Sequence, residues 1–330
     1  MLLRVKAPEW AQRLASDLTD MDRAPRPVAP AEVVEHDLPD DVYFEYAFID
    51  AEGKLRPDPA APGRAKSVWY GEVSCVTGPA YRADELADPP ADLATGRSDR
   101  LRLASAALGQ ERRVTVYTPS TVADDEPTPL AVVQDGVAFQ RVGGLHLVLE
   151  ALLRRGEAQP ARLAFIEPVD RLKEYAFSEP YARFVEEELQ PELESRFPLS
   201  ARRLWVGASL GALASATLAL RRAECDPAAA AGDAVLALSG AFLGTPEEFD
   251  PYRSRSSWLV ERLRDRSVPV AGAWCLHVGT LEWLHEVGRE AAAALRDRGV
   301  DVLYTESSAG HNWRNWKDAL PRALRWVLAP

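Results

Sequence analysis

The pattern G-x-S-x-G occupies residues 207–211, directly after the apolar run 204–206 and directly before the alanine-rich stretch 212–222. Between a strand and a helix, this pattern is typical of a nucleophile elbow, whose sharp turn exposes the serine hydroxyl for covalent catalysis. Glycine is needed two positions to either side of the serine, because the two backbones come too close there for side chains. The alternative is an ordinary turn with Ser209 as the N-cap of a helix. The position after an expected central strand favours Ser209 as a nucleophile.

A serine nucleophile needs a general base, and the chain order in this arrangement is serine, acid, histidine. Among the histidines after Ser209 we choose His311, which follows the apolar run 302–305 and is preceded by glycine. A loop after the last strand can bring a base over the elbow. We interpret His277, inside an apolar run, as a core histidine and His285, at the start of a helix, as a surface residue.

The acid that orients the base is expected at the carboxyl end of another strand. Glu282 lies three residues after Gly279, at the end of the apolar run 274–278. There it could hold the imidazole tautomer and stabilise the imidazolium. The alternative is a glutamate in the first turn of a helix, favoured by the helix dipole. Glu286 and Asp301 are the rival acids.

Acyl transfer also needs backbone N–H groups aimed at the developing oxyanion. We expect one from Leu210, immediately after the nucleophile, and one from Val137 in the loop 134–139. The alternative for that loop is a plain Asp-Gly turn. The residues together predict a serine hydrolase that acts on esters.

Composition limits the partners of this chain. It has 330 residues, 47% hydrophobic and 27% charged, and a formal net charge of -11. Nucleic acids and anionic membranes are held by clustered Lys and Arg, so neither is expected as a partner.

The first residues are interrupted by charges and proline, and no apolar run is long enough to span a membrane, so we expect a cytoplasmic protein. The three widely spaced cysteines indicate no disulfide framework and no zinc site, and no cofactor is expected.

The first part of the chain is expected to form a small β-domain. A short helix and an extended, proline-rich lead-in are predicted over the first forty residues. Runs of aromatic and β-branched residues at 42–49 and 68–76 then predict strands of a β-sandwich. The Pro- and Ala-rich segment 86–98 is the expected linker, so we divide the chain into domains 1–98 and 99–330.

The second part predicts an α/β domain. A hairpin is expected at 100–107 and 112–118, followed by alternating strands and helices. The expected strands are 130–133, 162–166, 204–206, 234–238, 274–278 and 302–305, and the expected helices are 145–154, 181–196, 210–222 and 284–298. This alternation favours a mainly parallel sheet covered on both faces. Ligands of such sheets bind at the carboxyl ends of the strands.

Several motifs together resemble the enterochelin esterase branch of the Putative esterase (esterase D) family of α/β-hydrolases. They are residues 130–136 (LAVVQDG), 207–211 (GASLG), 238–242 (LSGAF), 279–282 (GTLE) and 310–316 (GHNWRNW). Such enzymes carry an N-terminal β-sandwich ahead of the hydrolase domain. Residues 43–49, 56–59 and 69–71 look like that module.

The resemblance implies a triad of Ser209, Glu282 and His311, with Val137 and Leu210 as oxyanion donors. It also implies hydrolysis of the ester bonds of a catecholate siderophore, so that iron is released inside the cell. We assign substrate binding to Arg171 and Trp316. An anionic ferric siderophore needs positive charge near the site, which Arg171 and Lys173 could supply. For Arg171, solvated surface charge is an equal alternative.

Two other functions stay open at this point. A general carboxylesterase acting on small or aryl esters would need the same triad. A non-catalytic binding protein on a hydrolase fold is the alternative of another class, since fold does not imply function. It would be expected to have lost a triad residue, and all three are present. The sequence leaves the oligomeric state open.

Overall fold

A computed structural model describes the chain except for residues 91, 92, 94, 251, 252, 255 and 271. It contains two compact units. The first consists of Met1–Asp84, Val278–His285 and Glu306–Trp316, and the second of Glu85–His277, Glu286–Thr305 and Lys317–Pro330. The predicted domain boundary between residues 98 and 99 stays a prediction. Part of the predicted linker, residues 91, 92 and 94, lies outside the described residues.

The N-terminal strands form two sheets. In the smaller sheet β1 (Leu2–Lys6) pairs antiparallel with β4 (Val33–Asp37). The larger has the order β3-β2-β5-β8-β7, with β6 beside β5. Its strands are β2 (Arg13–Ser16), β3 (Met21–Pro27), β5 (Tyr43–Ile49), β6 (Leu55–Arg56), β7 (Gly63–Ser67) and β8 (Gly71–Thr77). All seven residues of β5 are buried, as expected for the central strand of this sheet.

Two expectations for this region are wrong. The first forty residues form four strands and a single 3-10 turn, η1 (Asp17–Thr19), instead of a short helix and a lead-in. Prolines fit in β3 because it is an edge strand, where a missing N–H breaks no pairing. The expected strand 68–76 begins only at Gly71, and the three residues before it form a turn that carries Trp69.

An eight-stranded sheet of order β16-β15-β14-β13-β11-β12-β10-β9 forms the core of the α/β fold. The strands β11 to β15 pair in parallel, while β9 and β10 form an antiparallel hairpin at one edge. Their bounds are β9 (Arg97–Ser105), β10 (Gln110–Thr118), β11 (Thr128–Val133), β12 (Arg162–Ile166), β13 (Leu199–Ala208), β14 (Ala234–Leu238), β15 (Ala273–Gly279) and β16 (Asp301–Ser307). The expected hairpin and the six later strands are thus all present.

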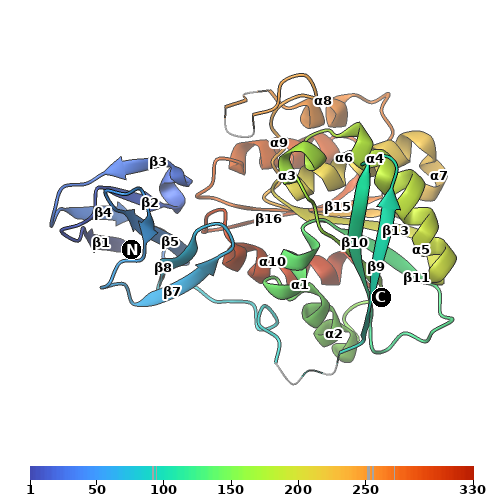
Figure 1. Cartoon of the computed structure of the whole chain (residues 1–330), viewed down its shortest axis with the longest axis horizontal. Coiled ribbons are helices and arrows are strands. Elements are labelled where there is room, and N and C mark those ends of the chain that lie inside the picture. Colours follow the sequence, from blue (N-terminus) through green and yellow to red (C-terminus); the bar gives the residue numbers. More distant parts are fainter. Residues whose placement is uncertain (91–92, 94, 251–252, 255, 271) are drawn as a thin grey trace. The chain divides into compact units, whose positions relative to one another are not determined.

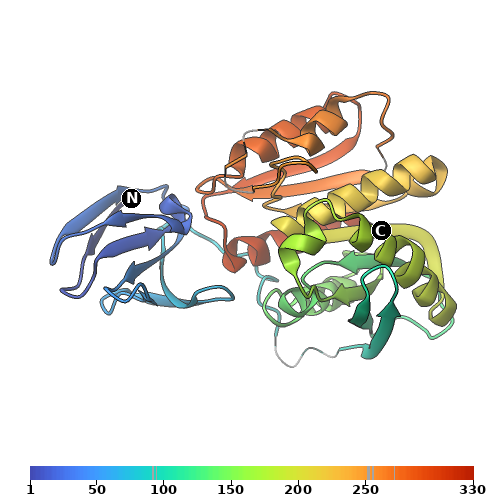
Figure 2. The same ribbon diagram turned by 45° about the horizontal axis from the view of Figure 1, so that its top comes forward.

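Helices lie on both sides of this sheet (Figures 1 and 2). They are α1 (Gly136–Arg141), α2 (Leu145–Arg155), α3 (Arg171–Tyr175), α4 (Glu179–Arg183), α5 (Gln190–Arg196), α6 (Leu210–Cys225), α7 (Pro227–Ala230), α8 (Trp258–Arg264), α9 (His285–Arg296) and α10 (Trp313–Val327), with a π-helical turn η2 (Phe184–Leu189) joining α4 to α5. The predicted α/β-hydrolase fold with a small N-terminal β-domain is confirmed. No helix in the described part of the chain has the length and apolarity of a membrane-spanning segment.

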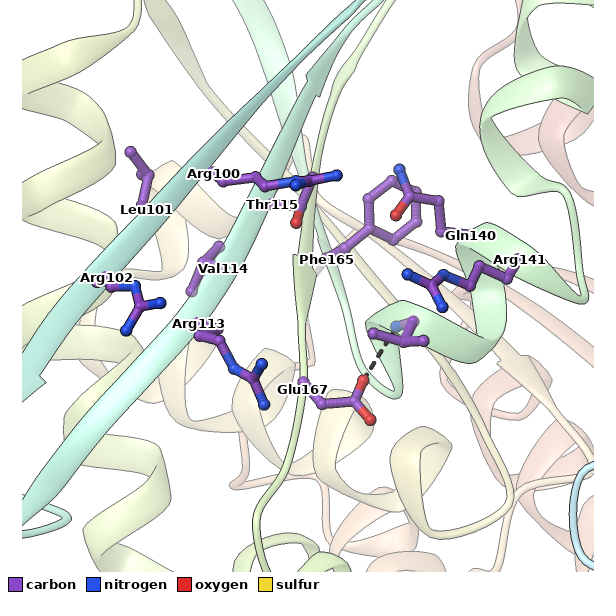
Figure 3. Close-up of a pocket in the computed structure, with 11 residues that line it drawn as sticks. Arg100, Leu101, Arg102, Arg113, Val114, Thr115, Gln140, Arg141, Phe165 and Glu167 are labelled. Carbon is purple, nitrogen blue, oxygen red and sulfur yellow. Dashed lines mark hydrogen bonds between the residues drawn. The ribbon is translucent and has the colours of Figure 1, made fainter.

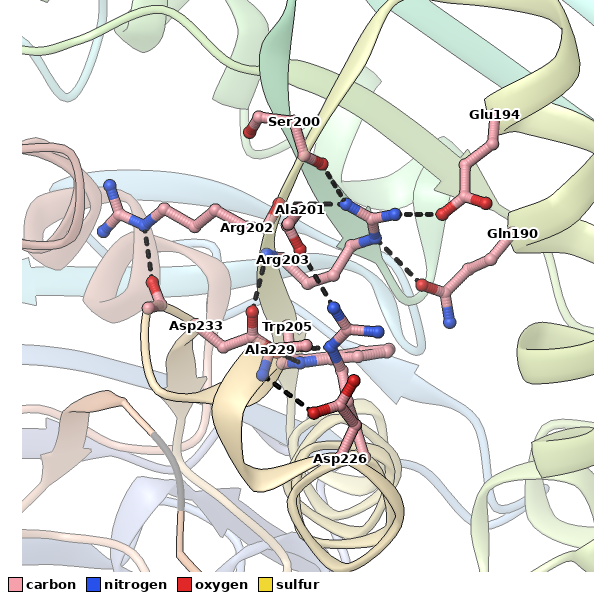
Figure 4. A network of polar contacts seen from close by, with 12 residues as sticks. Gln190, Glu194, Ser200, Ala201, Arg202, Arg203, Trp205, Asp226, Ala229 and Asp233 are labelled. Atoms are coloured by element: carbon pink, nitrogen blue, oxygen red, sulfur yellow. Dashed lines mark hydrogen bonds and ion pairs between the residues drawn. The ribbon is translucent and has the colours of Figure 1, made fainter.

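A buried polar network anchors β13 at the end away from Ser209 (Figure 4). The Asp233 carboxylate accepts hydrogen bonds from the backbone N–H of Arg203 at 2.8 Å and from Nε of Arg222 at 2.9 Å. The buried Arg203 guanidinium in turn donates to Gln190 at 2.9 Å. Because buried charges are tolerated when they are paired and hydrogen-bonded, this network fixes the strand that leads into the elbow.

Candidate active site

Ser209 has a backbone conformation that is rare for a residue with a side chain. Its φ is 55° and its ψ is -121°, between the end of β13 and the start of α6. The turn is held by hydrogen bonds from Ser209 N–H to the Leu238 carbonyl at 2.8 Å and from Ala241 N–H to the Ser209 carbonyl at 3.0 Å. Such strain is kept where surrounding structure enforces it, often at functional sites. Ser209 stands at the N-cap position of α6, but its side chain makes no capping hydrogen bond.

Both glycines of the motif lie in close contact with neighbouring groups. A Cβ on Gly207 would lie 2.2 Å from the carbonyl carbon of Gly211, because strand and helix backbones meet there. A Cβ on Gly211 would lie 2.9 Å from an Asp135 carboxylate oxygen. The loop after β11 therefore packs directly against the elbow.

Glu282 and His311 form a hydrogen-bonded pair in the first unit. Nδ1 of His311 contacts Oε2 of Glu282, and the other carboxylate oxygen accepts the Gly279 N–H at 2.6 Å. The Glu282 side chain is fully buried, whereas that of His311 keeps some exposure. With Nδ1 protonated toward Glu282, Nε2 is left as a proton acceptor, which is the tautomer a general base requires.

The loop that carries His311 is packed against the N-terminal strands. A Cβ on Gly310 would lie 2.2 Å from Cγ of Asp17, so only glycine fits beside the histidine. The Tyr43 N–H donates to the Ser308 carbonyl at 2.9 Å. Asn315 donates from Nδ2 to the Gly310 carbonyl at 3.0 Å. These contacts fix the backbone on both sides of the imidazole.

Three tryptophans surround the His311 ring. Trp69 stacks on it with ring centres 6.1 Å apart, Trp283 is at 4.7 Å, and Trp316 meets it edge-on at 5.1 Å. Trp69 comes from the turn between β7 and β8. Trp316 is only 1% exposed, so its ring supports the imidazole from within the fold. The predicted contact between Trp316 and substrate stays a prediction.

Two buried carboxyl groups, those of Asp17 and Glu45, lie on the N-terminal side of the loop that carries His311, and Asp17 packs against that loop. Asp17 accepts the Glu45 N–H at 2.7 Å and faces the Asn312 amide. Burial, and then the charge of Glu45, raise the pKa of Asp17 well above its usual range. Burial raises the pKa of Glu45 to about 7, although a hydrogen bond from the Tyr43 hydroxyl lowers it. Sequence reasoning missed Asp17, and its one possible sign was Gly310, where the Asp17 side chain leaves no room for a Cβ.

The rival acids and histidines have other surroundings. The Glu286 side chain is 76% exposed and lies 3.5 Å from Arg289, and Asp301 is exposed at the start of β16. His277 is buried in β15 with Nδ1 2.9 Å from the Thr305 hydroxyl, as expected for a core histidine. His285 lies 3.2 Å from Glu306. The structure brings only Glu282, of the acids considered, to His311.

The two expected oxyanion donors differ in their surroundings. Leu210 is the first residue of α6, where backbone N–H groups lack intrahelical partners. The Val137 N–H instead donates to the carboxylate of Glu167 at 3.0 Å. For Val137 to serve as a donor, an oxyanion would have to replace Glu167 at this amide. Its role therefore stays a prediction.

Arg171 is tied to the loop beside the elbow. Its guanidinium makes two hydrogen bonds to the Asp135 carboxylate, at 2.8 and 2.9 Å, and one to the Ala208 carbonyl at 3.2 Å. A bidentate pair of this kind fixes the geometry of both partners. The structure thus gives Arg171 a role in holding the elbow, and its predicted contact with substrate stays a prediction.

Comparison of the chain with known proteins identifies its family. The model of the family described as Putative esterase matches residues 105–327. The chain belongs to the Putative esterase family. An iron(III) enterobactin esterase from Dickeya dadantii is 28% identical over 244 residues, which is 68% of this chain. The match covers 53% of that relative, so the chain spans about half the length of the curated protein it resembles.

Solved structures of enterobactin esterases share the fold. That from Shigella flexneri, crystallised in the presence of enterobactin, is 20% identical, covers 99% of this chain and 92% of its own, and has a TM-score of 0.72. The ferric enterobactin esterase from Salmonella typhimurium is 18% identical with the same coverage and a TM-score of 0.76. The predicted resemblance to the enterochelin esterase branch of the Putative esterase family is confirmed.

Proposed function

We propose that this protein is a serine esterase with Ser209 as nucleophile, His311 as general base and Glu282 as the acid that orients His311. The observation that carries the proposal is the strained conformation of Ser209 on a strand-to-helix turn. The hydrogen bond between Glu282 and His311 supports it, because it leaves Nε2 of the histidine free to accept a proton.

In the proposed reaction the Ser209 hydroxyl oxygen attacks the ester carbonyl carbon while its proton passes to Nε2 of His311. The carbonyl oxygen becomes an oxyanion, which the Leu210 N–H stabilises together with the Val137 N–H, once the oxyanion has replaced Glu167 at that amide. Collapse of the tetrahedral intermediate breaks the ester C–O bond, and His311 returns the proton to the leaving alcohol. Water then attacks the acyl-enzyme in the same way and releases the acid and free Ser209.

The proposed substrate class is an ester of a catecholate siderophore, acted on in the cytoplasm. Support comes from the relatives: one is an iron(III) enterobactin esterase, and another was crystallised in the presence of enterobactin. A carboxylesterase of broad specificity would use the same three residues. The substrates therefore have to be compared directly.

The experiment is an assay of the pure protein with cyclic and linear catecholate esters alongside short-chain p-nitrophenyl esters, without added metal. The proposal predicts kcat/KM for the catecholate esters well above that for p-nitrophenyl esters. Equal values would favour the general carboxylesterase. Activity that is abolished by a chelator and restored by zinc would contradict a metal-independent serine mechanism.

A further inference from the structure

A cavity of about 510 Å³ opens where the β9–β10 hairpin, β12 and α1 meet. Its lining contains four arginines, Arg100, Arg102, Arg113 and Arg141, and a single carboxylate, Glu167. Figure 3 shows the guanidinium groups of Arg100, Arg113 and Arg141 around the same hollow, with Glu167 at its edge. The volume is that of an ordinary small-molecule site.

The strand register concentrates these charges on one face of the sheet. Arg113 of β10 lies directly opposite Arg102 of β9, and Arg100 lies opposite Thr115. Like charges directly opposite each other in a sheet destabilise it. On the other face the neighbouring Arg112 is buried in an ion pair with Glu174 at 2.7 Å. An ion pair therefore explains the arginine at position 112, whereas the described residues supply none that would explain Arg100, Arg113 and Arg141.

Most of the cavity arginines have no carboxylate bound to them. Arg102 pairs with Glu111 at 3.0 Å. For Arg100, Arg113 and Arg141, the described residues supply no hydrogen-bond acceptor and no carboxylate within ion-pair distance. The chain as a whole carries a net charge of -11, so three unpaired guanidinium groups facing one hollow create a local positive potential.

We propose that this cavity binds a small ligand with two or more anionic oxygens, held by Arg113, Arg141 and Arg100. Guanidinium groups bind pairs of such oxygens through two parallel hydrogen bonds, which suits carboxylates, catecholates and phosphates. An aryl acid and a phosphorylated compound are two sources of this chemistry. The proposal does not depend on the proposed esterase activity.

Glu167 is the group with which such a ligand must compete. Burial raises its pKa, while the Val137 N–H and the charges of Arg113 and Arg141 lower it. Because the Glu167 carboxylate lines the same cavity as these arginines, it would repel a second anion bound there. Val137 also lines the cavity and is 44% exposed, so the site adjoins the loop proposed to stabilise the oxyanion.

The test is isothermal titration of 2,3-dihydroxybenzoate and, separately, of inorganic pyrophosphate into the Ser209→Ala protein at low ionic strength. Because the Ser209→Ala protein lacks the proposed nucleophile, the measured binding does not depend on turnover. A lack of binding would therefore leave the proposed esterase function untouched. Arg113→Gln and Arg141→Gln should each raise Kd about tenfold or more, because each removes a charge-assisted hydrogen bond. Glu167→Gln should lower Kd, since the glutamine can still accept the Val137 N–H but carries no charge.

The matched control is Arg183→Gln, an exposed arginine of α4 that pairs with Glu187, which should leave Kd unchanged. Thermal melting confirms that each variant is folded. Tighter binding of one probe identifies the ligand as an aryl acid or as a phosphate. Binding of neither probe, or a Kd that is the same in Arg113→Gln and Arg141→Gln as in the parent, would overturn the proposal.

Discussion

Both carboxylate oxygens of Glu282 are in use, one by His311 and the other by the Gly279 N–H. Its side chain is therefore fixed, and so is the imidazole that it orients. Glu282→Gln keeps the shape and removes the charge that stabilises the imidazolium. We expect kcat to fall by about 10²- to 10⁴-fold with the fold intact. Steady-state kinetics with thermal melting measures this.

Glu286→Gln is the control for that substitution, because the Glu286 side chain is exposed on α9. It should leave kcat at the level of the unsubstituted protein. A folded Glu282→Gln protein with unchanged kcat, beside a strongly impaired Glu286→Gln protein, would move the role of the acid to Glu286.

The buried carboxyl group of Glu45 predicts a pH dependence of stability. Its pKa rises from 4.5 to about 7 on folding because of burial, so the folded protein keeps this proton longer than the unfolded chain. The contribution of Glu45 to the unfolding free energy should therefore be largest below pH 4.5 and be lost as the pH rises through about 7. Urea denaturation across this range should show a smaller fall for Glu45→Gln.

Glu35→Gln serves as the comparison, because Glu35 is an exposed residue of β4 that pairs with Arg4. Its stability profile should follow that of the unsubstituted protein. A Glu45→Gln profile with the same slope as the unsubstituted protein would show that Glu45 does not retain the proton.

At the scale of elements, the turn from β13 to α6 leaves no room for a side chain at Gly207. Gly207→Ala would place a methyl group 2.2 Å from the backbone of Gly211, and backbone atoms cannot rotate away as a side chain can. We expect a loss of about 1–3 kcal/mol or more in unfolding free energy together with loss of activity. Gly232→Ala, whose Cβ would meet nothing within 4 Å, should show neither change. Equal melting temperatures for the two variants would contradict this account of the elbow.

Elements with a strong local signal could be predicted from the sequence. The apolar runs 162–166 and 234–238 coincide with β12 and β14, because buried parallel strands are apolar along their whole length. The strands before residue 40 cannot be recognised in the sequence, because charges and prolines interrupt their pattern and edge strands tolerate both. The contacts of Asp17 and Glu167 join distant parts of the chain, and no local pattern records them.

In the candidate site, too, some residues could be recognised from local sequence patterns and others could not. Ser209, Glu282 and His311 each stand near a glycine that close packing requires, and this made them recognisable. The pairing of Val137 with Glu167 and of Arg171 with Asp135 depends on side chains from separate loops. Residue types alone could not show that these groups are already engaged.

At the scale of the whole molecule, the N-terminal strands and the loops carrying Glu282 and His311 belong to one compact unit. Asp17, Tyr43 and Trp69 all contact the His311 loop or its ring. Removal of residues 1–84 should therefore lower hydrolysis even of small p-nitrophenyl esters, by about 10²-fold or more, because misplacement of a catalytic group by about 1 Å has that effect. Circular dichroism would confirm that the shorter chain is folded. Unchanged turnover of p-nitrophenyl acetate by the shorter chain would show that the His311 loop keeps its position without residues 1–84.

The most direct test of the central claim is labelling of Ser209 by a fluorophosphonate, followed by mass spectrometry of the modified peptide. An activated serine reacts with such a reagent, whereas an ordinary surface serine does not. We expect one phosphonate per chain, located on Ser209, with labelling lost in Ser209→Ala and strongly slowed in His311→Ala. An unlabelled protein, or one whose label lies on another serine and persists in Ser209→Ala, would contradict it and favour a binding protein built on a hydrolase fold.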